Sequence, residues 1–294
     1  MIDSLLVRSA AWTNGEEYKD EYSERINQIS DLINKEGLVD FASSLRDNQP
    51  CTLSDKLSVG NFNFVLKIEF TDGVEWVARL RMPPMPESSS TLVNEKRKAL
   101  REMKSELATM EFVRQKTDIP IPRVYAYKLD ENNAVGCPFS IMEYIHGNTA
   151  EEMSQLYPGD HEGILAEFEE NFWHQLAQSM IRLASVRSAT EFYANYPLAL
   201  SKSLGERSVG GQIGLVQEFR AIAQSFGAQG SQNGFGLAHY DLNANNILVD
   251  RSFNILAIID WDSVIAFPDA ALYRVPFLLG MDCPVPGVIE TPPP

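Results

Sequence analysis

The segment from His239 to Asp262 constrains the fold of this chain more than any other part of the sequence. It opens with the polar run His239-Tyr240-Asp241-Leu242-Asn243-Ala244-Asn245-Asn246. Two short apolar stretches follow, 247–249 and 255–259, and the Asp and Asn residues between them favour a tight turn. We predict a polar loop and then a hairpin, with the carboxylates of Asp260 and Asp262 directly after its second strand.

Three side chains in this segment, Asp241, Asn246 and Asp260, offer hard oxygen donors. Phosphoryl transfer requires little covalent help from a protein, but it requires a base for the acceptor hydroxyl and oxygen ligands for the magnesium on the phosphates. A carboxylate, an amide and a second carboxylate meet both requirements. The alternative is that the run is merely a turn, because Asp and Asn side chains readily bond to nearby backbone.

The first half of the sequence predicts an α+β arrangement. Alternating apolar residues indicate five short strands over Leu57–Val65, Val65–Phe70, Glu75–Arg81, Val124–Leu129 and Pro138–Tyr144. A helix over Leu92–Gln115 lies between the third and fourth strands. Before the strands, Tyr18–Lys35 has the spacing of an amphipathic helix that stops at Gly37 and packs on the next domain. The second half reads as mainly helical, with a long helix over Glu167–Ser185.

The His-x-Asp-x-x-x-x-Asn pattern of 239–246 and the Ile259-Asp260-Trp261-Asp262 segment resemble the aminoglycoside phosphotransferase and choline kinase branch of the kinase-like superfamily, particularly the fungal phosphotransferase-enzyme family. The resemblance implies a two-lobed protein-kinase-like fold that uses ATP and Mg²⁺. It implies that Asp241 is the catalytic base and that Asn246 and Asp260 hold magnesium. Asp262 is then an additional acid on the substrate side.

The same resemblance implies nucleotide contacts in the first half of the chain. The loop containing Gly60 and Asn61 would cover the phosphates with its backbone N–H groups, although it has only one glycine. The segment 141–147 resembles the hinge between two lobes, where backbone groups of Glu143 and Ile145 would meet adenine. The simple end of an apolar strand is an equally good interpretation of that segment.

Arg79, in the sequence Val77-Ala78-Arg79, stands where the resemblance places a phosphate-pairing lysine. Glu106 in the following helix would be its ion-pair partner. Arginine is not equivalent to lysine here, because its planar guanidinium contacts phosphate in a bidentate manner. Strand alternation places Arg81 on the face of Arg79, and helical spacing places Glu102 on the face of Glu106, so a shifted pairing stays open.

Three regions follow from this interpretation: an N-terminal helical extension (1–49), a nucleotide-binding N-terminal lobe with an antiparallel sheet and a helix (50–144), and a mainly helical C-terminal lobe with the catalytic loop and acceptor site (145–294). The resemblance covers roughly residues 50 to 280. The chain stops soon after Asp260, with Thr291-Pro292-Pro293-Pro294. We therefore expect a shortened C-terminal lobe, and a catalytically weak or inactive ATP-binding relative is the alternative to an enzyme.

The composition narrows the choice of acceptor and partner. The formal net charge is -15, which disfavours binding to nucleic acid or to an anionic membrane. Residues 143–262 hold 15 acidic residues against 6 Lys and Arg, which favours a cationic acceptor, although a solvated acidic surface explains the count equally well. A protein kinase is less favoured, because Asp260-Trp261-Asp262 replaces the Asp-Phe-Gly of protein kinases. We expect transfer of the γ-phosphate of Mg-ATP to a hydroxyl of a small metabolite, an aminated one being favoured.

The lack of a targeting signal and of paired cysteines in the sequence allows a simple prediction of the cellular compartment. Cys51, Cys137 and Cys283 are widely spaced and odd in number, which suggests neither a disulfide framework nor a metal site. The sequence has no apolar run long enough to span a bilayer and no signal-peptide pattern at its start. These features predict a cytoplasmic protein, and they do not indicate its oligomeric state.

Overall fold

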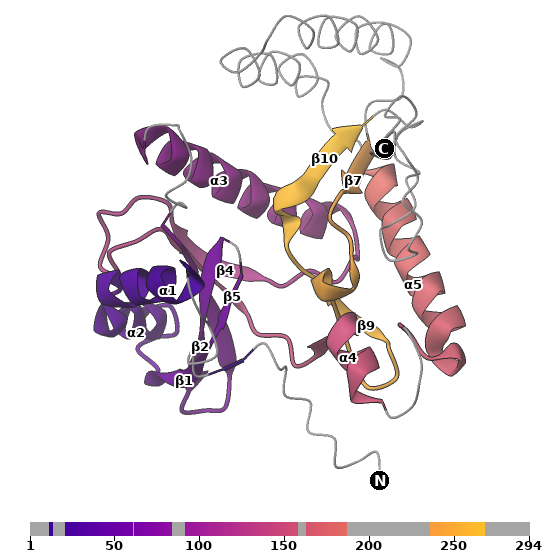
Figure 1. Cartoon of the computed structure of the whole chain (residues 1–294), viewed down its shortest axis with the longest axis horizontal. Helices are drawn as coiled ribbons and strands as arrows, with labels where there is room; N and C mark the ends of the chain where they lie inside the picture. Colours follow the sequence, from indigo (N-terminus) through magenta and orange to yellow (C-terminus); the bar gives the residue numbers. More distant parts are fainter. Residues whose placement is uncertain are drawn as a thin grey trace, which may run out of the picture. The chain divides into compact units, whose positions relative to one another are not determined.

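The computed structural model describes residues 12–13, 21–60, 62–83, 92–157, 163–186 and 236–267 (Figure 1). The chain divides into two compact units. The first comprises Met1–Gln115, Pro120–Trp173 and Ala244–Asp262, and the second comprises Lys116–Ile119, His174–Asn243 and Ser263–Pro294. These units differ from the three regions expected above, whose boundaries stay a prediction.

An antiparallel sheet forms the framework of the first unit. Its five strands, counted within the described residues, lie in the order β1-β2-β3-β5-β4. Their bounds are Cys51–Val59 (β1), Asn63–Phe70 (β2), Glu75–Arg81 (β3), Val124–Lys128 (β4) and Phe139–Glu143 (β5). The antiparallel sheet and its inserted helix are as predicted, but β1 begins at Cys51, well before the expected Leu57, and ends at Val59.

Strict alternation along β2 and β3 gives the sheet two different faces. Alternate residues such as Phe64, Ile68 and Ala78 are buried in a core shared with the helices α1 and α2. The residues between them, including Val65 and Arg79, point to the opposite face because successive strand side chains alternate. One face therefore stabilises the fold, and the other is available to build a site.

The N-terminal helix is in fact two helices, α1 (Glu21–Leu32) and α2 (Lys35–Ser44), which Figure 1 shows side by side. The prediction of one helix that stops at Gly37 is therefore wrong. Asn34 ends the first helix and caps the second, because its side chain accepts a hydrogen bond from Gly37 N at 3.1 Å. The backbone N–H of Asn34 also donates to Val135 O at 2.9 Å. Asn34 Nδ2 donates to Ala134 O at 3.0 Å, so contacts made about 100 residues away fix the break.

A long helix, α3 (Leu92–Lys116), follows the third strand, as the sequence predicts. Its buried stripe consists of Met103, Glu106, Leu107, Met110 and Val113. Glu106 is only 4% exposed, which is unusual for a carboxylate without a cation beside it. Its position in an apolar stripe indicates that a buried partner neutralises it.

The remainder of the first unit contains the predicted hairpin, β8 (Ile247–Val249) and β9 (Ile255–Ile258), to which β6 (Asn148–Thr149) adds a third strand. The helix α4 (Ala150–Leu156) starts with a capping box, in which Thr149 and Glu152 exchange hydrogen bonds with each other's backbone. Two short 3₁₀ turns flank the hairpin, η2 (Ala244–Asn246) and η3 (Trp261–Ser263).

The described part of the second unit contains the antiparallel pair β7 (Gly236–His239) and β10 (Val264–Phe267). Helix α5 (Ala166–Ser185) matches the predicted long helix and belongs to both units, because the division falls after Trp173. The rest of the predicted helical region, most of the Gly-rich loop over 227–236 and the C-terminal residues from 268 lie outside the described residues. None of the described helices is long and apolar enough to cross a membrane.

Substitution of Gly37 tests the close approach that α2 makes to the loop before β5. A Cβ at this position would lie 2.3 Å from Ala134 O, a backbone atom that cannot move cheaply. We expect Gly37→Ala to lower the unfolding free energy by about 1–3 kcal/mol in urea denaturation, although alanine is the better helix former. Lys35→Ala in the same helix is exposed and serves as the control. A Gly37→Ala protein as stable as this control would contradict the close approach.

Candidate active site

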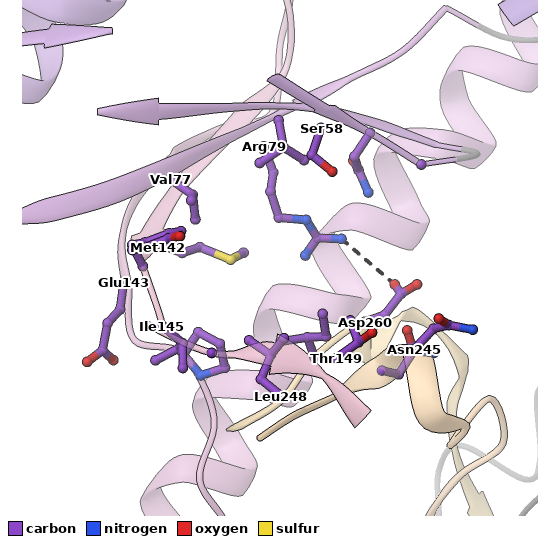
Figure 2. Close-up of a pocket in the computed structure, with 18 of the residues that line it drawn as sticks. Ser58, Val77, Arg79, Met142, Glu143, Ile145, Thr149, Asn245, Leu248 and Asp260 are labelled. Atoms are coloured by element: carbon purple, nitrogen blue, oxygen red, sulfur yellow. Dashed lines mark ion pairs between the residues drawn. The ribbon is translucent and has the colours of Figure 1, made fainter. Parts of the chain in front are cut away.

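A pocket of about 440 Å³ lies within the first unit (Figure 2). Its lining comes from the non-core face of β1–β3, from the segment that follows β5, from α4 and from the segment around the hairpin. Its volume is in the usual range for a small-ligand site. Six of the residues singled out in the sequence line it: Gly60, Arg79, Glu143, Ile145, Asn246 and Asp260.

Arg79 lies at the centre of the polar part of the pocket. Its Nη1 donates to Glu106 Oε1 at 2.5 Å, and its Nη2 lies 3.8 Å from Asp260 Oδ1. Figure 2 shows the guanidinium extending from the sheet toward Asp260, with the ion pair dashed. The pairing of Arg79 with Glu106 is therefore the one present, and it links β3, α3 and the segment after β9.

The shifted pairing left open by the sequence falls on a different part of the surface. Arg81 Nη2 pairs with Glu102 Oε2 at 2.9 Å, and its guanidinium lies 5.0 Å from the ring of Phe62. Neither Arg81 nor Glu102 is among the described residues that line the pocket. Of the two arginines, Arg79 is the one positioned to contact a ligand there.

Two opposing effects act on the pKa of Arg79. Burial lowers the pKa of the guanidinium, but the charges of Glu106 and Asp260 outweigh burial and raise it above the ordinary arginine value. The side chain therefore stays cationic although only 17% of it is exposed. A permanent, fixed positive charge in a partly dry pocket is suited to an anionic ligand.

The loop between β1 and β2 covers one side of the pocket. Gly60 N donates to Asn63 O at 2.9 Å, which closes the turn, and both residues line the pocket. A Cβ at Gly60 would meet only Asn63 O, at 4.0 Å, so a side chain would fit at this position. Asn61, predicted to contact phosphate, lies outside the described residues.

The segment after β5 contributes backbone groups to the pocket. Glu143 N donates to Arg123 O at 2.8 Å, and Ile145 O accepts from Gly147 N at 2.9 Å. Within the described residues the N–H of Ile145 makes no hydrogen bond. Because Ile145 lines the pocket, its N–H is available to donate to a ligand there.

Asn246 and Asp260 also line the pocket. A backbone hydrogen bond from Ile259 N to Asn246 O, 2.9 Å long, connects the two segments that carry them. Asp260 has a φ of 61°, in the left-handed region that few non-glycine residues adopt. Strained backbone of this kind persists where the surrounding structure dictates it, and it concentrates at functional sites.

The side-chain oxygens of Asn246 and Asp260 suit a hard divalent cation that takes its remaining ligands from water and phosphate. Asn246 and Asp260 present oxygens, as Mg²⁺ prefers. No group of three or more His, Cys, Asp or Glu that could hold a metal is found among the described residues. Because Mg²⁺ usually takes only one or two carboxylates and completes its shell with water and phosphate oxygens, a sparse protein set fits this metal.

Two predicted carboxylates, Asp241 and Asp262, are not among the described residues that line the pocket. Asp241 belongs to the second unit, where it is exposed and its Oδ1 accepts from Asn243 Nδ2 at 3.0 Å. Asp262 lies in η3, half-buried, and its charge contributes to the raised pKa of Arg79. The catalytic role of Asp241 and the substrate role of Asp262 stay predictions.

Sequence reasoning missed several residues that line the pocket, notably Trp12, Thr149 and Glu152. Thr149 and Glu152 form the capping box of α4, and the spacing Thr-x-x-Glu signals a helix start but gives no hint of a pocket. No local pattern marks Trp12, because its place in the pocket depends on contacts with residues far along the chain.

The fold and pocket together define a kinase-like phosphotransferase: an antiparallel sheet with an inserted helix, an Arg–Glu ion pair between them, and a loop, hairpin and carboxylate downstream. The profile of the phosphotransferase enzyme family matches residues 58–265, which is more than half of the chain. The chain belongs to this family.

Individual relatives match over shorter stretches. The mitochondrial protein "Altered inheritance of mitochondria protein 9" of Candida dubliniensis is 29% identical over 136 residues, covering 43% of this chain and 20% of that protein. A subtelomeric hrmA-associated cluster protein of Aspergillus fumigatus is 32% identical over 94 residues, covering 32% of this chain and 16% of the relative. The chain thus spans about a fifth or less of these relatives.

A solved structure shows the same fold. A proposed aminoglycoside phosphotransferase from Ralstonia eutropha JMP134 superposes with a TM-score of 0.50 and 14% identity, over 81% of this chain and 67% of that one. At this identity the similarity concerns the fold alone.

Removing Arg79 alone should cost more stability than removing the whole ion pair. Arg79→Met leaves the buried Glu106 without its cation, and we expect a loss of about 3–5 kcal/mol. The double variant Arg79→Met/Glu106→Leu should recover most of this loss, since apolar side chains of similar volume tolerate the site. A urea-unfolding cycle of both single variants and the double variant measures the coupling. Additive losses would contradict a buried, mutually dependent pair.

Proposed function

We propose that this chain transfers the γ-phosphoryl group of ATP, bound with Mg²⁺, to a hydroxyl of a small metabolite. One observation carries the proposal: Arg79, a buried cation, is held between Glu106 and Asp260 inside the pocket. This arrangement fixes a bidentate phosphate-binding group beside a carboxylate suited to a metal. A structural ion pair alone would not require a pocket in front of it.

The other end of the pocket suits an adenine base. Val77 and Leu248 provide apolar walls, which Figure 2 shows on opposite sides, and Met142 lies between them. The N–H of Ile145 faces no partner among the described residues, so it can donate to a ring nitrogen of the base. An apolar slot with a backbone donor at its wall favours a flat heteroaromatic ring.

The charge of the pocket requires a metal for nucleotide binding. Among the described residues that line it, Arg79 is the one Lys or Arg, against the carboxylates of Glu143, Glu152 and Asp260. The triphosphate of ATP would be repelled by these carboxylates unless a divalent cation neutralised it. When bound, Mg²⁺ would supply that neutralisation and orient the phosphates, with Asn246 and Asp260 as its protein ligands.

The chain's own residues then have separate tasks. Arg79 binds phosphate oxygens and stays charged through the reaction, because Glu106 holds it in one orientation. Asp241 accepts the proton of the acceptor hydroxyl as that oxygen attacks phosphorus, and Asp262 lies on the acceptor side. The phosphoryl group leaves ADP and forms an ester with the acceptor oxygen.

The acceptor is a small hydroxylated molecule, and an amine on it is favoured. The excess of acidic residues over 143–262 attracts cations. The structural relative from Ralstonia is named for action on aminoglycosides, which agrees with an aminated acceptor. An acidic surface without such a role remains the competing explanation, and a substrate panel separates the two.

Metal removal tests the nucleotide proposal directly. We expect Mg-ATP to bind measurably in isothermal titration calorimetry and the affinity to fall at least about 10-fold in EDTA, since the pocket carboxylates then repel the triphosphate. Asp260→Asn should reduce this metal dependence, whereas Asp31→Asn, an exposed aspartate in α1, should not change it. Equal affinity with and without metal would contradict the assignment of Asp260.

Turnover tests the catalytic role of Asp241. ADP release should be stimulated by one of a panel comprising choline, ethanolamine, aminoglycosides and a generic protein substrate. Asp241→Asn should lower kcat by about 100-fold or more while Mg-ATP affinity stays the same, because the variant loses proton transfer but keeps the nucleotide pocket. Full turnover in Asp241→Asn would show that Asp241 is not the catalytic base. A parent protein that binds no Mg-ATP would contradict the proposed phosphotransferase activity.

A further inference from the structure

The N-terminal segment contributes a residue to the pocket. Thr13 and Leu57 exchange two backbone hydrogen bonds, from Thr13 N to Leu57 O and from Leu57 N to Thr13 O, each 2.9 Å long. Leu57 directly precedes Ser58, Val59 and Gly60, which line the pocket. Residue 12 is thereby anchored beside the strand that leads into the phosphate loop.

Next to this anchor, the ring of Trp12 contacts the segment that follows β5. It packs edge-to-face with Tyr144, with the ring centroids 5.9 Å apart and an interplanar angle of 70°. Tyr144 stands between Glu143 and Ile145, the residue with the open N–H. Residues 12–13, which we call the strap, thus connect β1 to the proposed base-binding segment.

Tyr144, the packing partner of Trp12, is itself held by charged and aromatic side chains. Lys67 Nζ lies 5.4 Å from the Tyr144 ring, and His146 packs edge-to-face against it at 4.9 Å. Lys67 is fixed in turn by Glu75 at 2.8 Å, and His146 Nε2 lies 3.3 Å from the same carboxylate. Trp12 therefore packs on a braced aromatic ring and is still half-exposed.

We propose that Trp12 is a nucleobase-contacting residue and that the strap sets the affinity of the pocket for the base. The inference rests on the proposed nucleotide function. Trp12 lines the pocket beside the open Ile145 N–H, and its packing partner is the neighbour of that residue, so it belongs to the base end. Arg79 and Asp260 form the phosphate end. An indole offers a large, flat surface with low conformational cost, which is what base stacking requires.

A competing explanation is that Trp12 only fills space against Tyr144. The two explanations differ in what they predict for ligands with and without a base. If Trp12 contacts the base, its removal should lower the affinity for Mg-ATP and leave the affinity for Mg-tripolyphosphate, which has the phosphates alone, unchanged. A purely structural residue should affect both ligands together, or neither.

The test uses the full chain with Trp12→Ala, Trp12→Phe and the control Tyr127→Ala, which removes an aromatic ring that is 53% exposed and outside the described pocket lining. Trp12→Ala should weaken Mg-ATP by about 10- to 100-fold and leave Mg-tripolyphosphate unchanged. Trp12→Phe should recover most of the affinity, and Tyr127→Ala should match the parent protein. Melting temperatures without ligand identify any variant that fails to fold.

A second measurement covers the case in which Trp12→Ala does not fold. The chain has four tryptophans, so the fluorescence difference between the parent and Trp12→Phe isolates residue 12. Mg-ATP should quench this difference signal, and Mg-tripolyphosphate should not. Unchanged affinity in folded Trp12→Ala, or an unquenched difference signal, would overturn the strap proposal alone. A parent protein that binds no Mg-ATP would overturn both proposals.

Discussion

The buried charge of Arg79 is the constraint on which the site depends. Strand alternation directs this side chain away from the apolar core, to the face of the sheet where the pocket lies. An isolated cation there would be too costly, so α3 has to bring Glu106 within 2.5 Å. Asp260, 3.8 Å away, is attracted by the same guanidinium. One charge thus organises a strand, a helix and the segment after the hairpin around a single point.

This requirement explains why the charged part of the pocket, the proposed phosphate end, leaves a signal in the sequence. The resemblance to a known family singled out Arg79, Glu106, Asn246 and Asp260 in the sequence. Strand alternation along β3 and helical spacing in α3 were compatible with an Arg79–Glu106 pair. Spacing alone could not choose between Glu106 and Glu102, because both share a helix face. The choice depends on tertiary packing.

The errors of prediction have a common physical origin. The break between α1 and α2 depends on Asn34 bonding to the backbone of Ala134 and Val135, and no local pattern near residue 34 signals that contact. Likewise Gly37 looks like a helix stop in sequence, whereas its function is to let α2 approach Ala134. The early start of β1 follows from its pairing with β2, from Cys51 opposite Phe70. In each case a long-range contact overrides a local propensity.

The proposed base end of the pocket leaves a weaker signal in the sequence than the proposed phosphate end. Apolar walls such as Val77 and Leu248 could be replaced by many aliphatic side chains of similar shape, and a backbone N–H leaves no trace in the sequence. A contact that several residue types can make equally well leaves no recognisable motif in the sequence. Trp12 belongs to this group, since its position depends on a two-bond anchor at Leu57 and on the braced ring of Tyr144. The sequence therefore reveals most readily the part of the pocket where charge restricts the choice of residue. The residues of the proposed base end are recognised only when the fold brings distant segments together.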